Sequence, residues 1–473
     1  MPNYPGLPTP SYGIMYYRTP KEGLKITLKL NFEFASKVNA NFNGGNLSSD
    51  AGLLLFKEFC TVIGLEEMLK DIVANHASNI KKDHKDFDIV MQLVFQKLSG
   101  YYTDDAADDL REDPIFAEIM GKPLASQPTI SRFHNEFNKE DEGVQRFQEA
   151  QLQILETVYE IEKPKEIIFD FDSTFIKTNG KQQEANYNSY YGSKGFHPLV
   201  LFDGNTGDCI KAKLRPGEVY TSDGVKEFAN PVFDRYKDLY PDLDVIIRAD
   251  SGFACPALYK LCEEYEYDYV IRLKSNAVLE RKAEPYISEL HQKMEEDDDW
   301  YSYQVIYGEF TYQAGSWEKS RRVIVKVEKK EGEMVYSTSF YVTSLDWKPE
   351  KTVKFYNQRG TMENFIKEAK NGFGLDKLSS NNFLANEIKL QIAVLAYNVN
   401  NLTRRLCFPE NCQSMQMISI RPNIIKIAAK KVTSSRYTTF KMSSHAVYKD
   451  LFLEIHRNIS SLRKEKEPGA KAA

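Results

Sequence analysis

The clearest strand signal in the chain is the run Glu166-Ile167-Ile168-Phe169-Asp170-Phe171-Asp172-Ser173-Thr174-Phe175. Its hydrophobic residues predict a buried strand, and its aspartates place carboxylates toward the end of that strand. Two further strand-like segments follow at 197–203 and 209–214, and the turn residues Gly204-Asn205-Thr206-Gly207 join them. Together the three segments predict a meander with acidic side chains on its first strand.

Beyond the meander the pattern alternates between helix and strand. We expect an amphipathic helix at 222–239, a strand at 244–250, a helix at 255–265 and a strand at 269–274. Three strands followed by alternating helix and strand is the order of an RNase H-like α/β sheet. This order puts Asp172 in the first strand and Asp250 at the end of the fourth.

The rest of the chain divides by composition and periodicity. The expected parts are an irregular proline-rich arm (1–24), a mostly helical N-terminal domain (25–163), the first part of the α/β core (164–279), a β-rich insertion (280–348), the second part of the core (349–406) and a basic helical C-terminal region (407–473). The N-terminal domain opens with the alternating, strand-like run 25–32. A long apolar helix is expected at about 383–406.

A short polar helix start lies inside the N-terminal helical region, at Ala125-Ser126-Gln127-Pro128-Thr129-Ile130-Ser131-Arg132-Phe133-His134. A serine just before a helix with proline in its first turn is an ordinary start signal. Thr129, Ser131 and Arg132 also suit the recognition helix of a helix-turn-helix, which reads DNA in the major groove. We therefore predict these three residues as DNA contacts and 25–163 as a DNA-binding domain, with a purely structural helix as the alternative.

Composition defines the class of protein. With 473 residues, of which 42% are hydrophobic and 27% charged, the chain is long enough for several domains and too hydrophobic for a disordered protein. Its six cysteines show no C-x-x-C pair and no matching histidine spacing, so neither a zinc site nor a disulfide framework is indicated. No apolar run approaches the roughly 20 residues that span a bilayer. We expect a cytoplasmic protein with no membrane partner.

Charge is unevenly distributed along the chain. The net charge of −5 would by itself argue against a nucleic-acid partner, because phosphate binding needs positive potential. From residue 401 onward, however, 14 Lys and Arg stand against 5 Asp and Glu, a net charge of +9. This region is either a DNA-contacting face or a solvated helical surface.

A second motif lies at Tyr356-Asn357-Gln358-Arg359-Gly360-Thr361-Met362-Glu363-Asn364-Phe365-Ile366-Lys367-Glu368-Ala369-Lys370. On one helix at 100° per residue, positions 356, 359, 363 and 370 fall within about 60° of one another. This face joins a carboxylate to a phenol, a guanidinium and an ammonium, which suits a metal ligand flanked by phosphate contacts. A solvated face of ion pairs explains any two of these residues but not the whole spacing.

The spacing Tyr356-x2-Arg359-x3-Glu363-x6-Lys370 resembles the Y-R-E-K signature of bacterial insertion-sequence transposases of the DDE, RNase H-like superfamily. Asp172-Ser173-Thr174 after a hydrophobic strand is similar to the first catalytic block of that family. Arg248-Ala249-Asp250-Ser251-Gly252-Phe253 is similar to the second. The resemblance covers about residues 164–405.

The resemblance implies a DNA transposase that cuts the ends of an insertion sequence and rejoins them. Asp172, Asp250 and Glu363 would then hold two Mg²⁺ ions per site, with Mn²⁺ as a substitute, for an in-line displacement at phosphorus. Tyr356, Arg359 and Lys370 would contact the neighbouring phosphates. The implied partner is double-stranded DNA, both terminal inverted repeats and target, with the protein bound as a homodimer beside the bacterial nucleoid.

The resemblance also bears on the insertion. In some members with a β-rich insertion, a tryptophan stacks on a flipped base at the element end. We predict Trp317 for that role, with Trp300 as a second candidate, against the alternative that a strand tryptophan belongs to the core.

Two other readings of the motifs stay open. Asp170-Phe171-Asp172-Ser173-Thr174 also matches the D-x-D-x-T block of haloacid-dehalogenase-type phosphatases, in which Asp170 would be the nucleophile and Asp172 the acid/base. That reading leaves the 356–370 motif unused. The second is a catalytically silent DNA-binding protein derived from a transposase, which three intact carboxylates argue against. His197 is expected to be a strand histidine with a backbone partner rather than part of the site.

Overall fold

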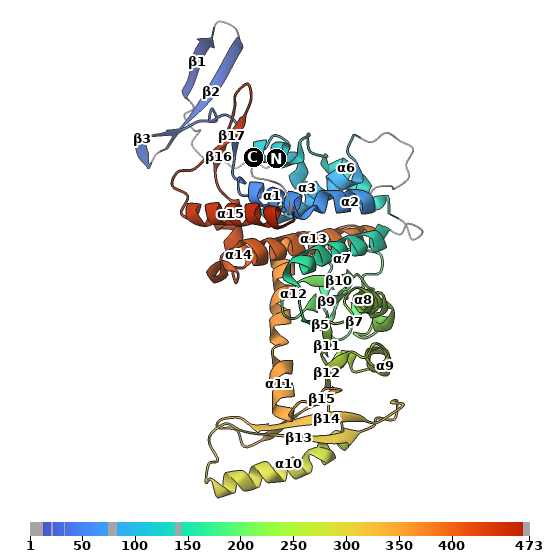
Figure 1. Cartoon of the computed structure of the whole chain (residues 1–473). Coiled ribbons are helices and arrows are strands. Elements are labelled where there is room, and N and C mark those ends of the chain that lie inside the picture. The colour runs from blue at the N-terminus through green and yellow to red at the C-terminus, as the bar shows by residue number, and fades with distance from the viewer. Residues whose placement is uncertain (1–12, 20–21, 33, 74–82, 138–142, 467–473) are drawn as a thin grey trace.

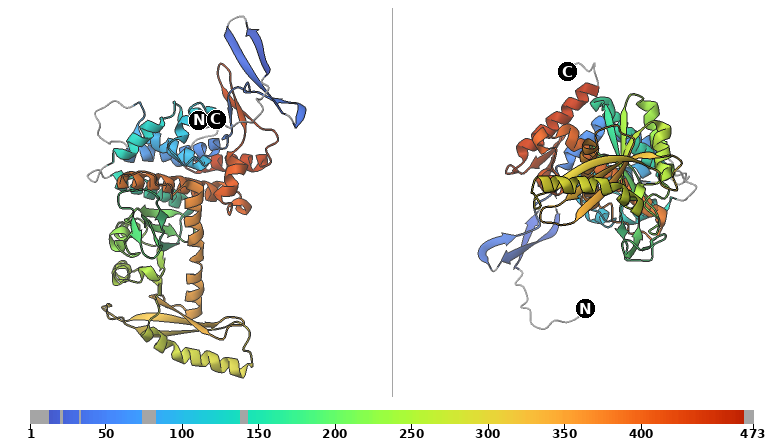
Figure 2. Two further views of the ribbon diagram at one scale, coloured as in Figure 1. Left: turned by 180° about the vertical axis from the view of Figure 1, so that it is seen from behind. Right: turned by 90° about the horizontal axis from the view of Figure 1, so that it is seen from below.

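The computed structural model describes residues 13–19, 22–32, 34–73, 83–137 and 143–466. Figure 1 shows a helical layer and two β-hairpins at one end, a mixed sheet in the middle and a second helix-covered sheet region at the other end. Seen from behind on the left of Figure 2, the same three levels follow one another along one axis; the view from below, on the right, looks along that axis. In the described part of the chain, no helix is long and apolar enough to cross a membrane.

The core is a mixed eight-stranded sheet that carries the first motif. Its order is β10-β9-β5-β11-β12-β15-β14-β13, with β5, β11 and β12 parallel and the other neighbours antiparallel. The elements of its first part are β5 (Glu166–Ser173), β9 (Leu199–Asp203), β10 (Cys209–Lys213), α8 (Val225–Leu239), β11 (Asp244–Ala249), α9 (Pro256–Tyr265) and β12 (Asp268–Leu273). The meander and the helix–strand alternation predicted for this stretch are therefore present. Between β5 and β9 the chain adds a small sheet of β6 (Ile176–Lys177), β8 (Ser193–Phe196) and β7 (Asn186–Asn188).

The predicted insertion differs from expectation in two ways. It begins with the 20-residue helix α10 (Ala277–Glu296) before its strands β13 (Gln304–Tyr312), β14 (Arg321–Lys329) and β15 (Tyr336–Thr343). Those strands do not form a separate unit, because β15 pairs with β12 and so extends the core sheet. The helix was missed because the chain there is mostly polar, and only Leu279, Ala283, Leu290 and Met294 on its buried face mark the helical period.

The second part of the core is helical, as predicted. α11 (Pro349–Asn357) and α12 (Gly360–Phe373) follow each other along one face of the sheet, while α8 and α9 cover the other face (Figure 1). The long helix α13 (Phe383–Cys407) packs against the sheet through β10 and against α3, α6 and α7 of the helical layer. It thus joins the two halves of the molecule.

The helical layer is formed by α1 (Leu53–Ile63), α2 (Leu65–Val73), α3 (Asp86–Ser99), α4 (Ala106–Asp109), α5 (Pro114–Met120), α6 (Gln127–Asn135) and α7 (Gly143–Glu162). Ahead of it come β1 (Gly13–Thr19), β2 (Glu22–Phe32), β3 (Ala35–Ala40) and β4 (Leu47–Ser48). The strand expected at 25–32 is part of β2. The irregular arm expected at 1–24 is wrong for 13–19, since β1 pairs antiparallel with β2 despite the prolines on either side.

The C-terminal region is not wholly helical as predicted. After α13 come a short 3₁₀ turn (Glu410–Cys412), α14 (Met417–Ile420), a π turn (Arg421–Ile425) and the final helix α15 (Lys449–Lys466). Between the π turn and α15 lies a hairpin of β16 (Ala429–Thr433) and β17 (Thr438–Met442), and β16 also pairs with β4. The β-branched run Val432-Thr433 and its partner Thr438-Thr439 favour strands over helix here.

The edge strand β10 is closed by side chains of α13. The amide of Asn398 accepts from the Cys209 backbone N–H at 2.9 Å and donates to the Cys209 carbonyl at 2.8 Å. Gln391 donates to the Ala212 carbonyl at 2.8 Å, and Glu387 accepts from the Leu214 N–H at 2.6 Å. The helix predicted as apolar therefore carries buried polar residues that satisfy the backbone groups of an edge strand.

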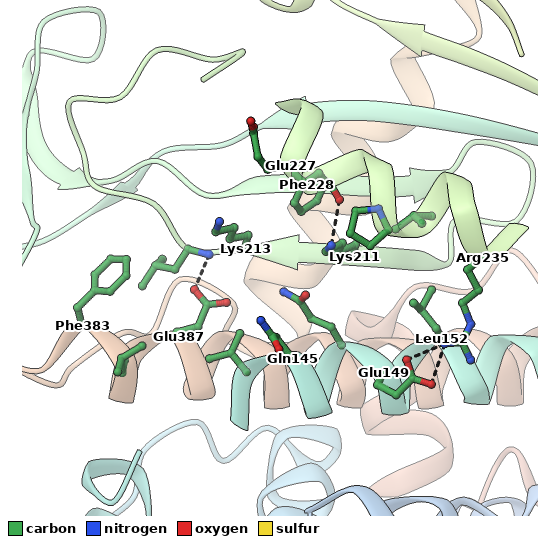
Figure 3. A pocket seen from close by; sticks show the side chains of 16 residues that line it. Gln145, Glu149, Leu152, Lys211, Lys213, Glu227, Phe228, Arg235, Phe383 and Glu387 are labelled. Atoms are coloured by element: carbon green, nitrogen blue, oxygen red, sulfur yellow. Dashed lines mark hydrogen bonds and ion pairs between the residues drawn. The ribbon is translucent and has the colours of Figure 1, made fainter. Parts of the chain in front are cut away.

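A cavity of about 950 Å³ lies beside this edge, between α7, β10, α8 and α13 (Figure 3). Several of its charged groups are bonded to the protein itself: Lys211 donates to the Phe228 carbonyl at 2.9 Å, and Arg235 forms an ion pair with Glu149 at 2.6 Å. None of the residues predicted for catalysis lines it. The cavity is separate from the site described next.

Candidate active site

Asp172 and Asp250 lie at the same end of two neighbouring strands. Asp172 is the penultimate residue of β5, and Asp250 directly follows β11. The strands run parallel, with Asp170 opposite Arg248 and Phe171 opposite Ala249. The same register carried one residue further sets the two carboxylates side by side, as the position of each at the end of its strand predicted.

Each carboxylate is held by a nearby backbone group. Asp172 accepts from the N–H of Ser173 at 2.8 Å. Asp250 accepts from the N–H of Gly252 at 2.8 Å and caps the short 3₁₀ turn Ser251–Phe253 that follows β11. These bonds fix the orientation of both side chains at the sheet end.

Glu363 reaches the same place from the other side. It is an exposed residue in the first turn of α12. The pKa of Asp172 is raised to about 6, mainly by burial; Arg359 lowers it, while the negative charges of Asp250 and Glu363 contribute to the rise. Asp172 of β5 is thus within electrostatic reach of one carboxylate after β11 and one on α12.

The helix motif is divided by a turn. α11 ends at Asn357 and α12 begins at Gly360, so the single continuous helix assumed for 356–370 is wrong at Gln358 and Arg359. Gly360 has no side chain to pack there, and its low helix propensity fits a break at this position. Both helices still run along the same face of the sheet (Figure 1).

Arg359 and Lys370 contact the first catalytic strand directly. Arg359 donates to the Phe171 carbonyl at 2.9 Å and lies 3.3 Å from the carboxylate of Asp172. Lys370 donates to the Thr174 hydroxyl at 2.6 Å and to the Phe175 carbonyl at 2.9 Å. Two cations therefore line the strand that carries Asp172.

Tyr356 lies deeper than its partners in the motif. Its ring packs against Tyr341 with centroids 4.8 Å apart, and burial raises the pKa of its hydroxyl to about 12. In the described structure this side chain supports the end of α11 and is 7% exposed.

A buried ion pair ties the two aspartate-bearing strands to each other and to α11. Arg248 of β11 binds Asp170 of β5 through two bonds of 2.7 Å, and both side chains are buried, at 1% and 0% exposure. The same guanidinium donates to the Phe355 carbonyl of α11 at 3.0 Å and lies over the Phe355 ring, 4.9 Å from its centroid. Asp170 is therefore a structural anchor and is not available as the nucleophile of a phosphatase.

Sequence reasoning missed this anchor, although a signal was present. Asp170 precedes Asp172 by two residues and Arg248 precedes Asp250 by two, so each member of the pair shares a strand face with a catalytic candidate. Gly204 packs directly against the pair, because a Cβ at that position would lie 2.5 Å from both side chains.

Exposed aromatic side chains border the carboxylates. Tyr191 stacks on Phe175 with centroids 4.6 Å apart, and its pKa is raised by burial and by the charges of Asp172 and Asp250. Tyr190, beside it, is 87% exposed. Sequence reasoning noted only a Gly/Asn/Tyr-rich connection here, because a loop gives no periodicity from which to place a side chain.

His197 lies near the same end of the sheet. Its Nδ1 bonds to the Val219 carbonyl at 2.9 Å, which confirms the backbone partner expected for it. Burial lowers the pKa of its imidazole.

Trp317 is not placed for base stacking. Its indole is 7% exposed and packs edge-on against Tyr259 and Tyr312, with the Arg321 guanidinium 5.4 Å from the ring centroid. The role predicted for Trp317 is corrected accordingly, since a ring enclosed on these sides has no face for a base. Trp300, the other candidate, is 36% exposed and packs against His291.

The predicted recognition helix lies apart from the carboxylates. On α6, Arg132 is exposed and Thr129 and Ser131 are half-buried; the Arg132 guanidinium donates to the Thr129 hydroxyl at 3.2 Å. The helix packs against α13, which separates it from the sheet (Figure 1). These three residues are thus not brought together with the catalytic candidates.

The donor set fits divalent cations. The described residues contain no ready-made group of three His, Cys, Asp or Glu side chains in metal-binding geometry. Asp172 is instead paired with Arg359. The three candidates nevertheless offer only hard carboxylate oxygens, which suit Mg²⁺ and similar cations. Burial and, to a smaller extent, the charges of Asp250 and Glu363 raise the pKa of Asp172, and a bound cation would offset both effects.

Two solved transposase structures are similar to the chain at low sequence identity. No curated protein matches the chain. Among solved structures, the cryo-EM structure of the piggyBac transposase synaptic complex with hairpin DNA is 14% identical, over 90% of this chain and 83% of that one, with a TM-score of 0.39. The crystal structure of the Mos1 strand transfer complex is 13% identical, over 46% of this chain and 75% of that one, with a TM-score of 0.15.

The family model for the transposase DDE domain, group 1, matches residues 30–464, which is most of the chain. The chain therefore belongs to this family and is a DNA transposase of the DDE type.

Proposed function

We propose that this protein carries out cut-and-paste transposition of an insertion sequence, with Asp172, Asp250 and Glu363 of an RNase H-like core as its catalytic carboxylates. The proposal is supported by the position of Asp172 and Asp250 at the same end of two neighbouring parallel strands, and by the bond from Lys370 to Thr174, which ties α12, the helix of Glu363, to that strand end. The strand order β10-β9-β5-β11-β12, with three antiparallel strands and then two parallel ones, supports the RNase H-like assignment.

DDE transposases use divalent metal ions. We propose Mg²⁺, two ions per site, held by Asp172, Asp250 and Glu363, with Mn²⁺ as a substitute. When bound, such ions activate an attacking water or 3′-hydroxyl and stabilise the leaving oxygen.

The cations of the motif bind the substrate. Arg359 and Lys370 lie along the strand that carries Asp172 and supply positive charge for phosphates beside the scissile bond, Arg359 as a planar fork and Lys370 as a point charge. Tyr356, predicted as a further phosphate contact, is only 7% exposed, so we propose that its ring supports the end of α11 beside Arg359 in place of binding DNA directly.

The substrate is double-stranded DNA at the terminal inverted repeats, and then target DNA. Residues 25–163 form the proposed DNA-binding domain, with Thr129, Ser131 and Arg132 of α6 as contacts on the exposed side of the helical layer. A homodimer on DNA would bring two element ends together, and light scattering with and without a terminal-repeat duplex tests for it.

The central test is metal-dependent nicking of a duplex carrying the terminal repeats that flank the gene. The wild-type protein should nick the strand at the element end with Mg²⁺ or Mn²⁺, and Asp250→Asn and Glu363→Gln should each abolish nicking. Glu350→Gln in α11 is the matched control, because Glu350 is exposed and only pairs with Lys354 on its own helix. Equal nicking by wild type and Glu363→Gln would overturn the assignment.

The same assay separates the other two readings. A silent DNA-binding protein would bind the duplex without nicking it. A phosphatase would release phosphate from a small phosphoester and lose that activity in Asp170→Asn, whereas a DDE transposase releases none.

A further inference from the structure

The hairpin β16–β17 is a basic element that stands out from the body of the protein. It rises from α15 on the far side of α13 from the mixed sheet, and both side views show it there (Figures 1 and 2). From 411 to 449 the chain has seven Lys and Arg and no Asp or Glu, although the whole protein has a net charge of −5.

The exposed face of the hairpin carries a pair of like charges. Lys430 on β16 lies directly opposite Lys441 on β17, and Val432 and Thr439 continue the same face. Neither lysine has a carboxylate partner among the described residues. Like charges directly opposite each other destabilise a strand pair, so the protein gains nothing in stability from this arrangement.

The opposite face fixes the hairpin to the body. Lys431 forms an ion pair with Glu118 of α5 at 2.8 Å, and its backbone N–H donates to the Asn46 carbonyl at 2.9 Å. Ala429 pairs with Ser48 of β4 and is buried. The outward face is therefore presented at a defined position rather than on a free strand.

The tip adds groups that bind phosphate. Arg436 lies in the turn between the strands, exposed and without a carboxylate partner in the described part of the chain. Tyr437 beside it is 73% exposed, and the flanking residues Thr433, Ser434 and Ser435 are exposed as well. Arginine, serine, threonine and tyrosine are the side chains that commonly contact phosphate oxygens in protein–DNA complexes.

We propose that the β16–β17 hairpin is a second DNA-contact surface, in which Lys430, Lys441 and Arg436 bind backbone phosphates of double-stranded DNA outside the active site. The uncompensated charge and the outward placement of the three cations carry this assignment, and a two-stranded β-ribbon is also narrow enough to enter a major groove. Because the contacts are to phosphates, they position DNA without reading its sequence. The inference rests on the proposed function only in taking DNA as the substrate.

The salt dependence of binding tests the proposal. Fluorescence anisotropy would measure binding of the full chain to a labelled duplex of arbitrary sequence, without divalent metal, over a range of salt concentrations. Each phosphate contact contributes about 0.9 to the slope of log K against log salt concentration. Lys430→Ala/Lys441→Ala should therefore lower the slope by about 2 and weaken binding about 60-fold at 0.1 M salt.

Three further variants make the result specific. Lys430→Arg/Lys441→Arg keeps both charges and should keep the wild-type slope. Lys226→Ala/Lys237→Ala removes two exposed lysines from α8, beside the core sheet, and should also leave the slope unchanged. Arg436→Ala at the turn should lower it by about 1, and it serves as the test if the double alanine variant fails to fold.

An unchanged slope in a folded double alanine variant would overturn the proposal, as would an equal loss in the α8 control. An unchanged slope would instead favour a protein partner for this surface. Because no metal is present and no cleavage is scored, a failure of the hairpin proposal is distinct from a failure of the nicking assay. The thermal midpoint of the double alanine variant should be no lower than that of the wild type, since the substitution removes a repulsion.

Discussion

The Arg248–Asp170 pair allows a quantitative test of how the active site is held together. Arg248→Met keeps a long apolar side chain but leaves the Asp170 carboxylate buried without a cation, where it now accepts two bonds of 2.7 Å. Removing one partner of a buried pair costs about 3–5 kcal/mol in the free energy of unfolding. We expect Arg248→Met to lose that amount.

The double variant Asp170→Leu/Arg248→Met separates stability from positioning. Replacing both members of a buried pair by apolar residues is often neutral or stabilising, while the Phe355 carbonyl, which loses its 3.0 Å donor, costs about 1–3 kcal/mol. The double variant should therefore unfold within about 2 kcal/mol of the wild type. Its nicking rate should stay low, because the end of α11 then loses its bond to Arg248 of β11, which helps to hold Arg359 beside Asp172.

Urea unfolding followed by circular dichroism gives the three free energies, and the nicking assay gives the rates. If the free energy of unfolding of Arg248→Met is less than about 1 kcal/mol below that of the wild type, Asp170 is not a buried, unpaired carboxylate in this variant, because burying such a group costs more than that. If the double variant nicks DNA at the wild-type rate, the pair supports the fold but not the geometry of the site.

Three further predictions follow from particular side chains. Burial raises the pKa of Glu387 from 4.5 to about 7, so the folded state binds this proton more tightly than the unfolded chain does. The free energy of unfolding should therefore fall by about 3 kcal/mol as the pH rises from 4.5 to 7. Glu387→Gln should flatten this pH dependence in thermal melts. Trp317→Ala should destabilise the protein by about 3–5 kcal/mol while leaving the affinity for DNA per folded molecule unchanged, and a selective loss of affinity would restore the stacking role. Gly204→Ala should lower the thermal midpoint, because the new methyl group would lie 2.5 Å from Asp170 and Arg248, and an unchanged midpoint would show that the pair can move aside.

The core could be predicted from sequence because each of its elements carries a local signal. The strands β5, β9, β10, β11 and β12 are continuous hydrophobic runs bounded by turns, and α8 and α9 are amphipathic, so the order of elements follows from periodicity alone. The two aspartates were identifiable because each closes a strand. Glu363 was found through its spacing from Tyr356, Arg359 and Lys370, which survives the turn at Gln358 because that turn keeps the chain in right-handed helical geometry.

What escaped prediction depends on contacts between segments far apart in the chain. The pairing of β15 with β12, which merges the insertion with the core, is set by tertiary packing and leaves no trace in either segment alone. The burial of Trp317 depends on Tyr259, 58 residues earlier. The hairpin at 429–442 was read as helical because its basic residues masked the short β-branched stretches.

Because side chains of α13 cover the β10 edge, β13 is the edge of the mixed sheet at which a further strand could pair. A strand contributed from elsewhere, whether another part of the chain or a grafted segment, would have to displace side chains of α13 from the N–H and carbonyl of Cys209, the carbonyl of Ala212 and the N–H of Leu214. Strands can therefore be added to this sheet on the side of β12, where β15, β14 and β13 already extend it. Attempts to split or enlarge the protein for engineering should therefore choose the β13 margin and leave the α13 side intact.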